Sequence, residues 1–80
     1  MRGGIEKVVR SAFSSIQKVP DESIDMEADL FSDYHIESLE ALRLMSTIEV
    51  GLDIEFPAEE MREVRTLQDI KDMAERLLAG

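Results

Sequence analysis

Apolar residues that recur at spacings of three and four positions are the feature that most constrains how this chain folds. The pattern runs through residues 4–18, 38–50 and 67–78. It places the apolar side chains on one side of a helix, and such a helix buries that side by packing against other elements. No segment alternates as an amphipathic strand does, and none carries a hairpin turn signal. The pattern therefore predicts an all-α fold.

The length of the chain limits it to one domain. With 80 residues it has room for a single core, and we expect one domain that spans residues 1–80. A hydrophobic fraction of 44% supports a packed interior, so the charged fraction of 34% does not by itself indicate disorder. Together with the helical pattern, this predicts a four-helix bundle.

Proline and glycine mark where the first two helices end. Pro20 is expected to end the first helix, because proline disfavours a helical conformation in the residue before it. From Pro20 to about Glu37 the apolar residues lack helical order, which predicts a long loop, with one helical turn at most, pinned across the bundle by its apolar side chains. Gly51 is expected to close the second helix in a left-handed conformation. A helix that continues through this glycine to Leu52 is the alternative.

A short third helix and a fourth helix complete the predicted bundle. Pro57 suits a first-turn position, and Glu59 and Glu60 suit the positive end of a helix. This third helix can hardly exceed two turns. Thr66, with Asp69 three residues later, is a near variant of the capping box and predicts the start of the fourth helix.

The charge of the chain is concentrated in its middle. The net charge is −9, and residues 19–61 hold thirteen acids and one base, Arg43. Such a surface disfavours nucleic acid and anionic lipid and favours partners with basic docking patches, although solubility alone is an alternative explanation. The N-terminus lacks the apolar run of a signal sequence, and no segment is long enough to span a bilayer. We expect a soluble, cytoplasmic monomer without membrane insertion.

Three kinds of catalytic or metal site fit this sequence poorly. There is no cysteine, which removes disulfides, thiolate nucleophiles and cysteine zinc sites. A calcium loop that starts at Asp25 would have Leu30 in place of the turn glycine and Ile36 in place of the last carboxylate. His35 lies three residues before Ser38, but a small bundle can hardly supply the orienting group and oxyanion donors that a nucleophile needs. We therefore predict no catalytic residue and no metal site.

The junction Glu37-Ser38-Leu39-Glu40 remains, between the long loop and the second helix. Glu37 is acceptable there as a helix cap or first-turn acid, and Ser38 as an early helix residue. At this point the sequence resembles the acyl carrier protein family, whose hallmark is an Asp-Ser-Leu triplet at the start of the second helix. The likeness continues without a gap through residues 52–57 to Thr66-Leu67-Gln68, whereas the first helix is similar in pattern only.

The resemblance implies a carrier that is not an enzyme. In such proteins a phosphopantetheinyl transferase, using coenzyme A and magnesium, attaches 4'-phosphopantetheine to the serine, and acyl groups ride on the terminal thiol. Ser38 would hold the arm and present the cargo to acyl-transferring or synthase enzymes of fatty acid, lipid or polyketide biosynthesis. The implied partner contacts are Glu37, Leu39, Glu40, Leu42, Glu49 and Phe56.

Departures from the family pattern indicate a specialised carrier. Glu37 replaces the usual aspartate, Tyr34 and His35 stand where a glycine-containing turn is common, and Arg43 and Val50 replace acids on the second helix. Neither the cargo, whether acyl, polyketide or aminoacyl, nor the pathway follows from the sequence. The alternative function is an unmodified interaction module or scaffold subunit that keeps the carrier fold.

Overall fold

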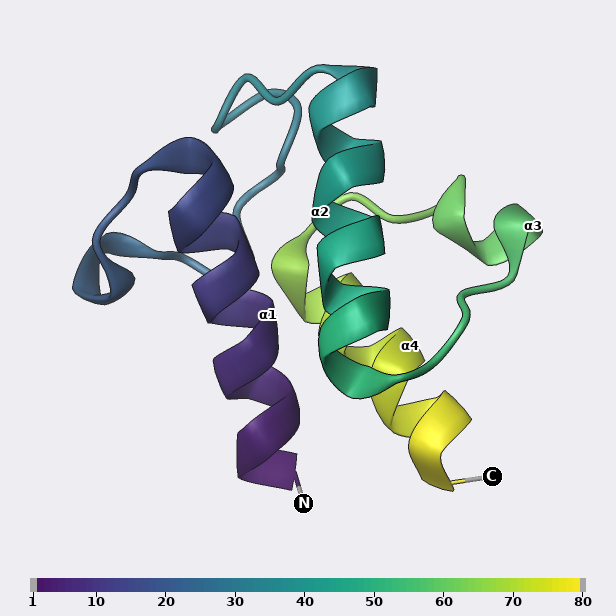
Figure 1. Ribbon diagram of the computed structural model, residues 1–80. Helices are drawn as coiled ribbons and strands as arrows, with labels where there is room; N and C mark the ends of the chain where they lie inside the picture. The colour runs from purple at the N-terminus through teal and green to yellow at the C-terminus, as the bar shows by residue number, and fades with distance from the viewer. Residues whose placement is uncertain (1, 80) are drawn as a thin grey trace.

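The computed structural model describes residues 2–79 and shows four α-helices and one 3-10 turn in them, with no strand. The elements are α1 (Arg2–Gln17), η1 (Asp21–Ser23), α2 (Ser38–Leu52), α3 (Ala58–Met61) and α4 (Leu67–Ala79). Helices α1 and α2 lie side by side and run in opposite directions, and α3 lies on the side of α2 away from α1 (Figure 1). The all-α prediction, with its long loop and short third helix, is confirmed.

The prediction that Gly51 ends the second helix is wrong, and the alternative is correct. Helix α2 continues to Leu52, and Asp53 then takes the left-handed conformation with a φ of 55°. Gly51 stands inside the helix at its approach to α1, where a Cβ atom would lie 2.9 Å from Cγ1 of Val8. The glycine therefore permits close helix packing, and the turn is left to an aspartate, which tolerates this conformation.

One core joins all parts of the chain. The apolar stripes of the helices meet in it, and apolar side chains of the connections fill its edges. The buried residues are Ile5, Val9, Ala12, Phe13, Ile24, Met26, Leu30, Ile36, Leu44, Met45, Ile48, Phe56, Val64, Leu67, Ile70, Met73 and Ala74. Four of them belong to the long loop, which is therefore pinned across the bundle as expected.

Backbone contacts tie the long loop to the start of α4. The amide of Leu30 donates to the carbonyl of Arg65 at 2.7 Å, and that of Gln68 donates to the carbonyl of Met26 at 2.9 Å. The predicted cap of the last helix is present, since the Asp69 amide donates to Thr66 Oγ1 at 3.0 Å and the Thr66 amide to Asp69 Oδ2 at 3.1 Å. Within residues 2–79, no helix is long and apolar enough to cross a membrane.

Asp29 is the polar centre of this contact between the loop and α4. Its Oδ1 accepts from the amides of Phe31 and Ser32 at 2.8 and 2.9 Å, and its Oδ2 accepts from Nε of Arg65 at 2.9 Å. The hydrogen bond from the Ser32 amide and then that from Arg65 lower the pKa of Asp29 from 3.8 to about 2. Hydrogen bonds to a carboxylate favour its ionised form, so the ionised side chain stabilises the folded state.

We therefore expect Asp29→Asn to lower the stability of the protein at neutral pH and to matter less in acid. Because the folded pKa lies below the unfolded value, the contribution of Asp29 is complete above about pH 4 and is lost as the pH falls through about 2. Thermal melts of both proteins across this range should show Tm values that converge toward acid. Asp25→Asn is the matched control, since Asp25 Oδ1 accepts one local bond, from Glu27. A Tm difference that stays constant across the range would contradict this account.

Candidate functional site

Ser38 is the first residue of α2 and its side chain is exposed. Glu37 precedes the helix in an extended conformation, and its amide donates to Oε1 of Glu40 at 3.0 Å. Its carbonyl accepts from the Ala41 amide at 2.9 Å, which starts the hydrogen-bond ladder of the helix. Glu37 and Glu40 therefore form the helix start, while the Ser38 hydroxyl, which makes no hydrogen bond to residues 2–79, is available for chemistry.

Three successive residues determine the shape of the loop that leads to Ser38. The ring of Tyr34 packs edge-on against Phe13, with the centroids 4.8 Å apart, and its hydroxyl accepts from the Asp25 amide at 2.9 Å. His35 has a φ of 58°, in the left-handed region that glycine adopts most easily. Ile36 is buried, and its amide donates to the Leu30 carbonyl at 3.0 Å. The approach to the serine is therefore a fixed turn, with His35 as its left-handed residue.

An open groove lies beside Ser38, between α2 and α3. Its volume is about 540 Å³, and most of its lining is apolar. The residues that line it are Phe31, Ser38, Ala41, Leu42, Ala58, Met61, Arg62, Val64 and Arg65. The guanidinium of Arg65 lies 5.4 Å from the centroid of the Phe31 ring and pairs with Asp29 at 2.8 Å. A group attached to Ser38 therefore has solvent on one side and an apolar surface with two arginines on the other.

The structure separates the predicted partner contacts into two sets. Leu39 and Leu42 are exposed at 69% and 58%, as surface contacts must be, and Glu37 is also exposed. Phe56 is 4% exposed and belongs to the core, so the prediction that it contacts partners is wrong. Its place in the apolar-proline turn after α2 turns its ring inward.

Two of the predicted docking acids are engaged within the chain. Glu40 is half-buried and accepts from the Glu37 amide, and its Oε2 lies 3.4 Å from Nε2 of Gln17. Glu49 is half-buried and accepts from the Phe56 amide at 2.7 Å. Both carboxylates therefore stabilise the ends of α2.

The two arginines that line the groove beside Ser38 could not be predicted from the sequence, because no local pattern links Arg62 and Arg65 to Ser38.

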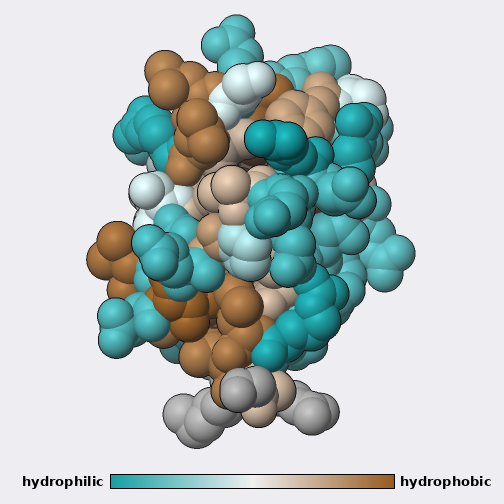
Figure 2. Space-filling view, turned by 90° about the vertical axis from the view of Figure 1, so that its right-hand side faces the viewer, coloured by the Kyte–Doolittle hydropathy of each residue, from teal (hydrophilic) through white to brown (hydrophobic). Residues whose placement is uncertain are grey.

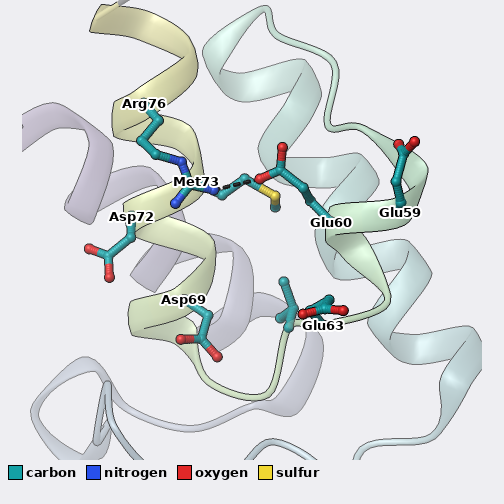
Figure 3. Close-up of a pocket in the computed structure, with 8 residues that line it drawn as sticks. Glu59, Glu60, Glu63, Asp69, Asp72, Met73 and Arg76 are labelled. Atoms are coloured by element: carbon teal, nitrogen blue, oxygen red, sulfur yellow. Dashed lines mark hydrogen bonds and ion pairs between the residues drawn. The ribbon is translucent and has the colours of Figure 1, made fainter.

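A second pocket, with a volume of about 470 Å³, lies between α3 and α4. Five carboxylates surround it, together with Val64, Met73 and Arg76, and Glu60 pairs with Arg76 (Figure 3). The five acids are Glu59, Glu60, Glu63, Asp69 and Asp72. Among residues 2–79, no group of three or more side chains is arranged to hold a metal ion. The lining of this pocket is therefore mostly acidic.

A helical bundle that presents an exposed serine at a helix start, beside an open and mostly apolar groove, has the architecture of a carrier domain. The family model described as "Phosphopantetheine attachment site" matches residues 7–74. The chain is 33% identical over 57 residues to the acyl carrier protein of Coprothermobacter proteolyticus, and this alignment covers 71% of this chain and 70% of that protein. It is 35% identical over 54 residues to the acyl carrier protein of Syntrophobacter fumaroxidans, and this alignment covers 68% of this chain and 67% of that protein.

The chain belongs to the acyl carrier protein family. Its domain is of the kind that carries covalent 4'-phosphopantetheine, and it serves as a carrier without catalytic activity of its own. Carriers of this family work with a phosphopantetheinyl transferase and with enzymes that handle acyl groups.

Proposed function

We propose that Ser38 carries the phosphopantetheine arm and that the protein presents acyl groups on it to partner enzymes. The observation that carries this proposal is the exposed hydroxyl at the first residue of α2, beside the open groove and within the residues that the family model matches. The arm supplies a terminal thiol, which holds the acyl group as a thioester. The residues that line the groove beside Ser38 would orient the arm and contact its cargo.

The surroundings of Ser38 fit a phosphodiester at this position. The hydroxyl lies at the N-terminal end of a helix of fifteen residues, where the helix dipole favours an anionic group. Arg62 and Arg65 line the same groove and add positive charge. The apolar part of the groove, from Phe31, Leu42 and Met61, offers a surface for the arm or for an apolar cargo.

We further propose that this is a specialised carrier that acts as a monomer in the cytoplasm. Arg43 and Val50 on α2 support a choice of partners different from that of a housekeeping fatty acid carrier. Leu39 and Leu42 are the proposed apolar partner contacts, and Glu37 is the proposed acidic contact closest to the attachment site. Few apolar anchors keep affinity low, which suits a protein that must dissociate after each transfer. The cargo proposed is an acyl group, with polyketide and aminoacyl groups as variants of the same chemistry.

The proposal is tested by loading the purified protein. Incubation with coenzyme A, magnesium and a broad-specificity phosphopantetheinyl transferase should increase the intact mass by one phosphopantetheine group. The fixed turn from Tyr34 to Ile36 presents the serine without rearrangement, so we expect complete conversion. An unchanged mass, with a known carrier labelled in the same reaction, would favour an unmodified scaffold instead.

A further inference from the structure

The outward face of α2 consists of six exposed residues, Leu39, Leu42, Arg43, Ser46, Thr47 and Val50. At about 100° per residue these positions form one continuous strip along the helix. Three of them are large apolar side chains, with exposures of 69%, 58% and 83% for Leu39, Leu42 and Val50. One is a base and two are neutral hydroxyl residues. Throughout α2, which the structure describes in full, this strip carries no acid.

The two acids of α2 lie off this strip and are engaged elsewhere. Glu40 accepts from the Glu37 amide at the start of the helix, and Glu49 accepts from the Phe56 amide after its end. Both are half-buried. A partner that approaches the outward face of α2 therefore meets an apolar surface with a positive charge, although the chain as a whole has a net charge of −9.

Arg43 places that positive charge within the apolar strip. It is exposed, and no ion pair joins it to any other residue in the part of the chain that the structure describes. The hydroxyl of Thr47 donates to the backbone carbonyl of Arg43 at 2.8 Å, and this hydrogen bond does not involve the guanidinium. Leu39 and Val50 lie four residues before it and seven after it, at positions on the same side of the helix. A docked partner would cover the guanidinium together with both apolar side chains.

We propose that the outward face of α2 selects partner enzymes with an apolar docking surface and a carboxylate opposite Arg43, and that Arg43 disfavours partners with a basic docking patch. This rests on the proposed function, since it concerns the enzymes to which the carrier presents its cargo. Like charges brought together in an interface are costly and act as a device against wrong partners. At 0.1 M salt, exposed charges more than about 10 Å apart are largely screened, so the charges nearest to the interface, Arg43 among them, weigh most when a partner is docked.

The same exposed strip contains the apolar anchors that such a partner would need. Exposed large apolar side chains are concentrated on α2, because three of the five such residues in the described part of the chain lie on this helix. In the space-filling view, hydrophobic side chains gather toward the left-hand side of the face shown, and hydrophilic ones cover most of the right-hand side (Figure 2). The exposed apolar side chains of α2 are the ones beside which Arg43 would discriminate between docked partners.

The test is a binding measurement with two probes that differ only in charge. One is a carrier-dependent β-ketoacyl synthase with a basic docking patch, and the other is the same synthase with the arginines of that patch changed to glutamate. Each is titrated into ¹⁵N-labelled protein with Ser38 unmodified, and Kd is obtained from the shifts of the α2 amides. We expect the native protein to bind the glutamate form roughly fivefold more tightly, and Arg43→Glu to reverse this preference.

Two further variants make the result specific to the outward face. Arg43→Gln should remove most of the preference. Lys18→Glu makes the same change of net charge as Arg43→Glu, but at the residue that follows α1, and should leave the preference unchanged. A native protein that prefers the basic synthase would overturn the proposal, as would a preference that Lys18→Glu shifts as much as Arg43→Glu does. The titration needs no arm on Ser38, so its outcome is independent of the loading experiment.

Discussion

Replacing Ser38 with alanine should abolish loading of the arm and leave the fold intact. The intact mass of Ser38→Ala should stay unchanged under conditions that convert the native protein completely. The stability should also stay the same, because the helix start is made by Glu37 and Glu40, whose contact at 3.0 Å does not involve the serine side chain. Exposed substitutions outside special contacts change the free energy of unfolding by no more than about 0.5 kcal/mol. Mass spectrometry and a urea melt of the same sample measure both effects.

Ser23 in η1 is the matched control. It is exposed, as Ser38 is, but lies in the turn after α1 and away from the loop-to-helix junction. Ser23→Ala should load as the native protein does. Loading of Ser38→Ala would move the attachment site to another residue, and loss of loading in both variants would point to a general effect on transferase recognition.

The parts of the fold that depend on local pattern could be predicted from the sequence. Helical periodicity predicted the three long helices, and the pairing of Thr66 with Asp69 predicted the start of α4. The junction at Ser38 could also be predicted, because a loop without helical order meets a periodic segment there. Each of these features is determined by residues within a few positions of one another.

The parts that depend on distant residues could not be predicted. Gly51 looked like a helix end because glycine adopts left-handed conformations easily, whereas its role depends on Val8, far away in the sequence. The family resemblance implied that Phe56 contacts partners, but the turn after α2 directs it into the core. The engagement of Glu49 follows from the same turn, since its carboxylate accepts from the Phe56 amide. Tertiary contacts decided these three positions, and sequence spacing alone does not report them.

Truncating Phe13 to alanine is expected to have the largest effect on stability. Phe13 is completely buried in α1, and its ring packs edge-on against Tyr34 at 4.8 Å. Removal of a buried phenylalanine ring costs about 3–5 kcal/mol, because apolar burial is lost and a cavity remains. A domain of this size has a free energy of unfolding of only about 4–12 kcal/mol, so the variant should be unfolded in a much larger fraction of molecules. A urea melt followed by circular dichroism measures the change.

The same contact also reaches the attachment site, which makes its loss informative about function. Tyr34 begins the turn before Ser38 and holds Asp25 through its hydroxyl at 2.9 Å, so loss of the Phe13 ring should loosen residues 34–37 first. Phe13→Leu keeps most of the buried volume and should remain folded, with faster amide exchange at Ile36 and slower loading of the arm. Tyr34→Phe removes only the hydroxyl and should lower the free energy of unfolding by about 1 kcal/mol. If Phe13→Leu exchanged and loaded as the native protein does, the edge-on contact would not be what holds the approach to Ser38.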